Sequence, residues 1–234
     1  MLANVLAISD LQLPFEHRDA LKFCAHVQKI FFPDILPEII CMGDEVDQHT
    51  LGKFSPNPNG KSGSDELEEA KHRLKDWFRV FPNCKVCTSN HTYRIYKKAF
   101  HAGIPSQFLL SIAEVYGAPP TWSWHDRILV YDILFEHGEN VSGPLAAINA
   151  ATQNQRCTVI GHQHSNGGVL HRHAFDKTLW GLNTGCLIDV KTYAFEYGKT
   201  LRNKPTLGCG IVRNGNPYFI PMILDRNQRW VGYI

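Results

Sequence analysis

Residues 39–47 read Ile-Ile-Cys-Met-Gly-Asp-Glu-Val-Asp, and this stretch decides the fold. Four apolar residues followed at once by a glycine and Asp44 are typical of a short strand buried on both faces. The run 5–8 has the same form and is followed closely by Asp10. Between the two runs, apolar residues recur at helical spacing over 19–32. A strand, a helix and a second strand in this order predict a parallel sheet in an α/β protein.

The same alternation continues beyond this unit, so the sequence predicts further strands and helices of similar length. An apolar stripe at helical spacing (Leu67, Ala70, Leu74, Trp77, Phe78 and Phe81) indicates a helix that packs on the core. In chain order we expect a loop over 55–63, a helix capped by Ser62 or Ser64, a strand over 85–88, helical structure over 93–117 that is broken near Gly103 and Pro105, a strand over 127–135, a short helix over 144–151, a strand over 157–160 and a β-rich remainder.

Length and composition place the chain among ordinary globular proteins. The 234 residues suit a single domain over 1–234, and the net charge of +2 gives no overall basic field that would favour nucleic acid. No apolar run reaches the ~18 residues that span a bilayer, and no secretory signal is visible. Seven cysteines scattered through apolar runs favour a reducing, cytoplasmic setting. Cys84 and Cys87 form a lone CxxC, a weak zinc signal because a structural site needs four ligands.

Residues of the types that bind metals follow five of the predicted strands. Because the carboxyl ends of parallel strands meet at one edge of a sheet, we expect these side chains to converge. Each Gly-Asp or Gly-His pair is common by itself, and an aspartate after a strand often caps a helix instead. Their number and order make a metal site the better interpretation. The residues concerned are Asp10, Asp44, Asn90, His137 and the pair His162 and His164.

In this order the motifs resemble the signature of calcineurin-like metallophosphoesterases, which is DxH, GDxxD, GNH, a histidine before glycine, and GHxH. The resemblance covers residues 8–164 and implies an α/β fold in which a β-sandwich is flanked by helices, a four-layer αββα arrangement. The β-rich tail from Leu179 would complete the second sheet. The matching segments are Asp10-Leu-Gln12, Gly43-Asp44-Glu-Val-Asp47, Ser89-Asn90-His91, His137-Gly138 and Gly161-His162-Gln-His164.

The resemblance also implies a role for each matching residue at a centre of two divalent ions. Two such ions about 3.5–4 Å apart can clamp a phosphate and hold a bridging hydroxide in line for attack. His91 would act as general acid or transition-state stabiliser, with Asp47 as its catalytic partner, and Arg94 would join Asn90 and His91 in binding substrate. The implied ligands are Asp10, Gln12 and His164 for the first ion, Asn90, His137 and His162 for the second, and Asp44 as the bridge between them.

Two positions depart from the family pattern. Gln12 stands where the family has histidine, and an amide oxygen is a harder and weaker donor than imidazole. If Gln12 coordinates, the first site should favour manganese or magnesium over zinc; if it does not, that site should bind its ion weakly or exchange it freely. We expect Mn²⁺, with Mg²⁺, Fe, Zn²⁺ and Ni²⁺ as alternatives. Ser89 replaces the glycine before Asn90, which asks only for a less unusual backbone geometry at that turn.

The function predicted is hydrolysis of a phosphodiester or phosphomonoester, nucleotide or nucleic-acid related, with no membrane involved. Two alternatives remain: a DNA or RNA nuclease, and a non-catalytic scaffold with a degraded metal site, to which Gln12 points. We expect residues 93–124 to form a helical insertion that walls the site. Arg94, Lys97 and Lys98 are either a phosphate-binding edge or a solvated helix face, and the sequence slightly favours the latter.

Overall fold

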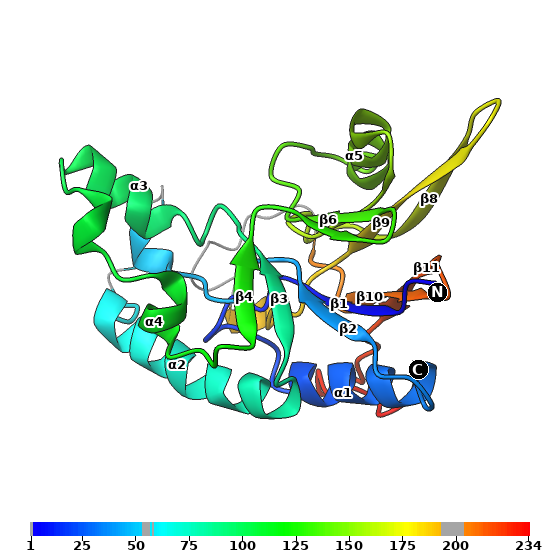
Figure 1. The fold of residues 1–234 in the computed structure, drawn as a ribbon. Helices are drawn as coiled ribbons and strands as arrows, with labels where there is room; N and C mark the ends of the chain where they lie inside the picture. The colour runs from blue at the N-terminus through cyan, green and yellow to red at the C-terminus, as the bar shows by residue number, and fades with distance from the viewer. Residues whose placement is uncertain (1, 53–56, 58, 193–203) are drawn as a thin grey trace.

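The computed structural model describes residues 2–52, 57, 59–192 and 204–234, and these form two β-sheets packed face to face between helices. In Figure 1 helices α1 and α2 lie below the first sheet, and α5 lies above the second. The predicted α/β fold, a β-sandwich flanked by helices in four αββα layers, is therefore confirmed. The loop expected over 55–63 lies partly outside the described residues.

The first sheet carries the strands that the opening of the sequence predicts. Its order is β11-β10-β1-β2-β3-β4, in which β1 to β4 run parallel, β10 pairs antiparallel with β1, and β11 pairs antiparallel with β10. The register sets Val5 opposite Glu38 and Ile8 opposite Cys41, so β1 and β2 end at the same level. The elements of this half are β1 (Val5–Ile8), α1 (Ala20–Phe31), β2 (Glu38–Cys41), α2 (Gly63–Val80), β3 (Cys84–Cys87), β4 (Trp122–His125), β10 (Gly208–Arg213) and β11 (Asn216–Pro221).

The second sheet has the order β5-β6-β7-β9-β8, and β6, β7 and β9 run parallel. The strand predicted over 127–135 is instead a hairpin of two strands that turns at Tyr131. The β-rich tail divides between the sheets, because β9 joins the second sheet whereas β10 and β11 extend the first. The elements of this half are β5 (Ile128–Val130), β6 (Ile133–Glu136), α5 (Ala146–Asn154), β7 (Cys157–Ile160), β8 (Gly167–His173) and β9 (Thr178–Thr184).

Short helices lie beyond one end of the sheets, on the left of Figure 1. Most belong to the segment between β3 and β4, which is the segment predicted as a wall over 93–124; its last residues enter β4 of the first sheet. These helices are η1 (His49–Leu51), α3 (Arg94–His101), η2 (Ser106–Phe108) and α4 (Ile112–Tyr116).

Three apolar clusters fill the spaces between the four layers. Phe23 and Leu74 belong to the cluster between the first sheet and its helices, Val5 and Phe135 to the one between the sheets, and Ile160 packs with alanines of α5. Successive residues of β1 alternate between the first two clusters, as residues of a strand buried on both faces must. Burial of this kind is the main favourable term in folding.

The CxxC pair does not form a site. Cys84 lies in the cluster under the helices and Cys87 in the cluster between the sheets, so the two thiols are on opposite faces of β3. Residues three apart in a strand must point in opposite directions, which excludes a shared ion. All seven cysteines are free thiols.

Among the described residues, no helix is long and apolar enough to cross a membrane.

Candidate metal centre

All seven predicted metal ligands meet where the carboxyl ends of parallel strands from both sheets come together. Asp10, Gln12, Asp44 and Asn90 follow β1, β2 and β3 of the first sheet, while His137, His162 and His164 follow β6 and β7 of the second. Side chains 154 residues apart, Asp10 and His164, are thereby brought into contact. The convergence predicted from the strand ends is thus what the structure shows.

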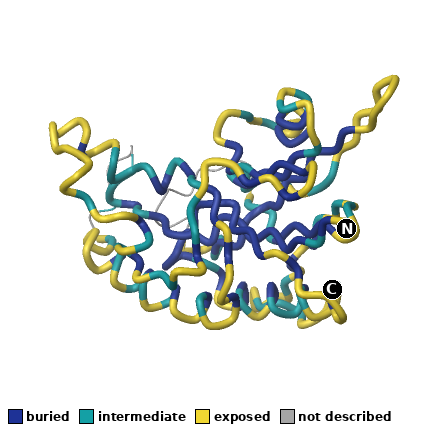
Figure 2. Tube along the Cα trace, viewed as in Figure 1, coloured by how far each residue is buried: buried dark blue, intermediate teal, exposed yellow. Residues whose placement is uncertain are grey.

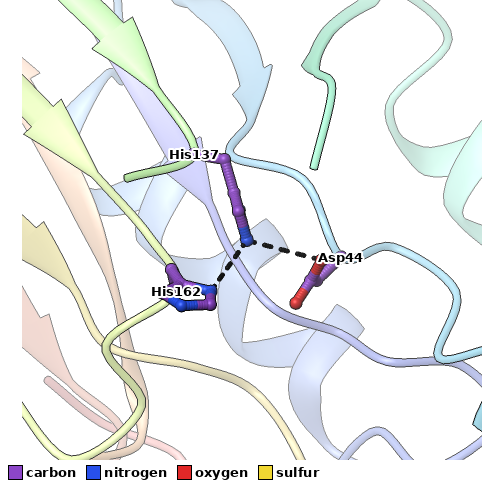
Figure 3. Close-up of side chains that lie close together, drawn as sticks. All are labelled: Asp44, His137 and His162. Carbon is purple, nitrogen blue, oxygen red and sulfur yellow. Dashed lines mark hydrogen bonds and ion pairs between the residues drawn. The ribbon is translucent and has the colours of Figure 1, made fainter. Parts of the chain in front are cut away.

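One group of candidate ligands surrounds His137. Its Nε2 lies 2.9 Å from Asn90 Oδ1, 3.1 Å from His162 Nδ1 and 3.5 Å from Asp44 Oδ1. Figure 3 shows Asp44, His137 and His162 pointing toward one another. On the far side of the ring, His137 Nδ1 donates to the Met42 carbonyl at 2.8 Å. That bond fixes the tautomer and leaves Nε2 with a lone pair directed into the group, as in metal-bound histidines.

The second group shares Asp44 with the first and adds Asp10 and His164. His164 Nε2 lies 3.0 Å from Asp10 Oδ1, and the Gln12 amide reaches both His164 Nε2 at 3.2 Å and Asp44 Oδ2 at 3.3 Å. Asp44 therefore belongs to both groups of candidate ligands.

Two buried oxygens in these groups accept no hydrogen bond from any described residue. They are Gln12 Oε1 and Asp44 Oδ1, and Asp44 Oδ1 has only the longer contact of 3.5 Å with His137. A buried polar atom without a partner costs roughly 1–3 kcal/mol. Carboxylate, imidazole and amide donors are the set that binds hard and borderline divalent cations, so the residues present fit such ions.

Electrostatics lead to the same conclusion. Burial lowers the pKa of His164, but the nearby carboxylates, Asp10 foremost and then Asp44 and Asp47, together outweigh burial and leave the pKa above its usual value. Burial also lowers the pKa of His137, but Asp44 and Asp10, together with the hydrogen bond to the Met42 carbonyl, leave it above its usual value. For Asp44, burial raises the pKa, yet the imidazoles of His91 and His137 hold it below its usual range. The site therefore favours positive charge, which divalent cations would supply.

The backbone beneath the ligands is unusual. Asp10, Gln12, Asp44 and His162 all have a positive φ, between 49° and 64°. Side chains adopt this conformation rarely, and such strain gathers at functional sites. Glycine matters at Gly43, where an added Cβ would lie 2.9 Å from His137 Nδ1, so only glycine lets β2 end against that ring.

His91 lies beside the ligands in contact with Asp47 and Arg94. Its Nε2 is 2.6 Å from Arg94 Nη2 and 3.5 Å from Asp44 Oδ2, and its Nδ1 is 3.3 Å from Asp47 Oδ1. Burial lowers the pKa of His91 to about 4. A guanidinium only donates, so His91 is neutral, accepts at Nε2, and carries its proton on the side of Asp47. Arg94, predicted to bind substrate, also donates to the backbone carbonyls of Asp47 and Gln48.

Sequence reasoning missed two residues that support the ligands. Ser89 Oγ accepts the Asp44 N–H at 3.1 Å and the Thr92 N–H at 3.2 Å, and so fixes the turn that carries the shared carboxylate. Glu45 is buried, and burial raises its pKa to about 7 even though Trp124 Nε1 donates to it at 2.9 Å. The Ser89 bond joins residues 45 apart, and a glutamate after Gly-Asp is unremarkable, so no local pattern could reveal either.

A cavity of about 560 Å³ adjoins the centre. It is bordered by Asn90 and His162 among the candidate ligands and by the side chains of α3 on its other side. Its volume is in the range of small-molecule sites.

Comparisons with known proteins give a likeness in structure only. No protein-family model matches the sequence, and no curated protein matches it. The chain is similar in structure to a metallophosphoesterase from Sphaerobacter thermophilus, with 15% sequence identity and a TM-score of 0.45, over 94% of this chain and 88% of that one.

Proposed function

We propose that this protein is a metal-dependent phosphoesterase that hydrolyses a phosphodiester or phosphomonoester with two divalent ions. The observation that carries the proposal is the shared carboxylate of Asp44. It belongs both to the group with His137 and His162 and to the group with Asp10 and His164. A single carboxylate between two sets of ligands is what a pair of ions held close together requires.

The donor set suits phosphate chemistry. Divalent ions bound here would polarise the phosphate and lower the pKa of a water molecule toward neutrality. Asp10 and Asp44 supply the only two carboxylates among the proposed ligands, so two ions would leave the site positively charged and attractive to a phosphate anion. Because oxygen donors from Gln12 and Asn90 join the imidazoles, we propose Mn²⁺ as the ion.

His91 is the proposed residue that contacts the reacting phosphate. It is buried and neutral, it lies 3.5 Å from Asp44, and Asp47 and Arg94 hold both of its ring nitrogens in place. To act on the phosphate, the ring would exchange its Nε2 contact with Arg94 for one with substrate and take up a proton from solvent; the resulting imidazolium would stabilise charge on the phosphate oxygens and pass that proton to the leaving group. Asp47 and Arg94 would then be positioning residues.

The test measures hydrolysis of a chromogenic phosphodiester and of the matching monoester, with Mn²⁺ and with a chelator. Wild type is compared with Asp44→Asn and with Asp132→Asn, which removes a carboxylate from an exposed turn of the second sheet. Mn²⁺ binding is followed separately by calorimetry. We expect turnover that needs Mn²⁺, survives in Asp132→Asn and is lost in Asp44→Asn, together with two bound ions per wild-type chain.

The outcomes separate the proposal from its alternative. If wild type binds two ions but hydrolyses neither ester with any divalent metal, the chain is a scaffold rather than an enzyme. If wild type and Asp44→Asn hydrolyse both esters equally well, Asp44 is not the shared ligand and the proposal fails.

A further inference from the structure

Helix α3 presents a row of basic side chains to the cavity beside the metal centre. They occur at positions i, i+3, i+4 and i+7, the spacing that places side chains on one helix face. All four border the cavity of about 560 Å³ that also touches Asn90 and His162. Glu139 is the acidic residue among those bordering it. The row consists of Arg94, Lys97, Lys98 and His101.

The middle of the row is available to a ligand. Arg94 is engaged with His91 and with backbone carbonyls, but Lys97 and Lys98 are exposed and form no ion pair with any residue in the described part of the chain. If Lys97 and Lys98 belonged to a solvated helix face directed away from the site, they would not line a cavity that also touches the candidate ligands. Here the two lysines instead line the same hollow as the candidate ligands, which favours binding of an anion that extends beyond one phosphate.

Exposed aromatic and apolar side chains continue the row. A second hollow, of about 410 Å³, shares Lys97 and His101 with the first and is lined further by Phe100 and Ile104. The Phe100 side chain is 79% exposed. Figure 2 shows this end of the molecule as exposed chain. A solvated phenylalanine beside two unpaired lysines combines the two features by which proteins hold single strands, a cationic track and a stacking surface.

We propose that Lys97, Lys98, Phe100 and His101, here called the α3 strip, bind a single strand of nucleic acid whose phosphodiester lies at the metal centre. This inference rests on the proposed function and names its substrate class. From Arg94 to His101 the helix advances about 10 Å. Lys97 and Lys98 on this length would each contact one phosphate, with a base stacked on Phe100.

An anionic lipid surface is the competing ligand, because exposed apolar side chains and lysines also attract membranes. The observations favour a strand. The cations line a hollow that reaches two of the candidate ligands, and a strand can enter it whereas a bilayer cannot.

The test compares Lys97→Glu/Lys98→Glu with Lys22→Glu/Lys75→Glu, which changes the net charge equally but on exposed positions of α1 and α2, away from the centre. Each double variant and Phe100→Ala is assayed with a small chromogenic phosphodiester and with an oligothymidylate of about 12 nucleotides. Oligothymidylate binding is measured separately by fluorescence anisotropy at several salt concentrations. Vesicles of equal phosphatidylglycerol and phosphatidylcholine test lipid binding.

We expect Lys97→Glu/Lys98→Glu to lose at least tenfold in kcat/KM for the oligonucleotide, while the chromogenic ester is unaffected. The slope of log Kd against log salt should shrink by about 1.4, at roughly 0.7 for each lost phosphate contact. Phe100→Ala should weaken oligonucleotide binding about fivefold to a hundredfold. The α1 and α2 double variant should behave as wild type.

If the two double variants change kcat/KM and binding of the oligonucleotide equally, the α3 strip does not bind the strand, while the proposed function remains intact. Vesicle binding that depends on Lys97 and Lys98, with no preference for the oligonucleotide, would replace nucleic acid by lipid. If wild type hydrolyses neither substrate, the proposed function fails, yet oligonucleotide binding that depends on Lys97 and Lys98 would still support the strip.

Discussion

Gln12 has an amide at the position where calcineurin-like metallophosphoesterases, the family that the sequence resembles, have an imidazole. Its Nε2 lies near both His164 and Asp44, and its Oε1 is buried without a partner. The two ends of an amide have the same shape, so a half-turn of the group would bring the oxygen to the position between His164 and Asp44. We therefore propose Gln12 as a ligand of the ion beside Asp10 and His164.

Gln12→His should raise the affinity for Zn²⁺ relative to Mn²⁺, since imidazole is the softer donor. Calorimetric titration of both metals into wild type and variant measures the ratio, and a melting curve checks that the buried site tolerates the ring. An unchanged ratio in a folded variant would mean that Gln12 does not coordinate.

Ser89, at the position where the family pattern has glycine, supplies a hydroxyl that accepts a hydrogen bond from the Asp44 backbone. Ser89→Ala removes the acceptor of the Asp44 N–H, and partners of this kind typically contribute 10- to 100-fold to metal affinity. We expect a loss of about tenfold in Mn²⁺ affinity with the fold unchanged. Ser64→Ala, at an exposed position in α2, is the matched control. Equal affinity in the two variants would reduce Ser89 to a turn residue.

The candidate ligands could be predicted from sequence because each follows a recognisable apolar run at a strand end. The supporting contacts could not. The hydrogen bond between Ser89 and Asp44 and that between Trp124 and Glu45 join residues 45 and 79 positions apart. Such pairs follow from how the strands lie in the sheet and leave no local pattern.

Among the elements, the β5–β6 hairpin is where the sequence misleads. Residues 128–136 are apolar almost throughout, and the turn contains neither glycine nor asparagine. Tyr131 nevertheless adopts a φ of 53°, a conformation that turns normally assign to those residues. Asp132 is the one polar residue between the two strands, and with apolar residues on both sides of it the reversal of the chain was not predicted.

Tyr131→Asn should stabilise the protein by roughly 0.5–1 kcal/mol, because asparagine tolerates the left-handed conformation and the tyrosine side chain is 56% exposed. Urea denaturation gives the free energy of unfolding. Tyr131→Phe keeps the strain and serves as the control, with no change expected. A destabilised asparagine variant would show that the ring contributes more than the strain costs.

At the scale of the whole molecule, residues near the C-terminus contact the start of α1 and pack against it. Arg229 donates to both Asp19 oxygens, at 2.7 and 2.6 Å, across 210 residues of sequence, and the Trp230 ring packs on Phe23 with centroids 5.7 Å apart. Neither contact was predicted, and the placement of the last strands in the first sheet was not predicted either. Pairing between distant segments depends on the assembled core and not on local pattern.

The contact between Asp19 and Arg229 should make the free energy of unfolding depend on pH in the acid range. The hydrogen bonds from Arg229 lower the pKa of Asp19 from 3.8 to about 2. Because the folded pKa is the lower one, the stabilisation is fully present above pH 3.8 and disappears as the pH falls through about 2. Its size is about 1–2 kcal/mol, reduced by the exposure of Arg229.

Asp19→Asn should lose that amount at neutral pH and show little further loss from this contact in acid. Urea denaturation at several pH values measures it against Asp76→Asn, whose pair with Arg79 is exposed on both sides. Parallel pH profiles for wild type and Asp19→Asn would contradict the assignment.

The two sheets each supply part of the metal centre, Asp10 and Asp44 from one and His137, His162 and His164 from the other. Ions held there would act as a reversible cross-link between the halves of the sandwich. Separating the sheets would then also require release of the ions. For one ion, this adds about 2.7 kcal/mol to the free energy of unfolding when the free metal concentration is a hundred times the dissociation constant. The supply of metal would then set how firmly the sandwich is closed as well as whether its centre can act.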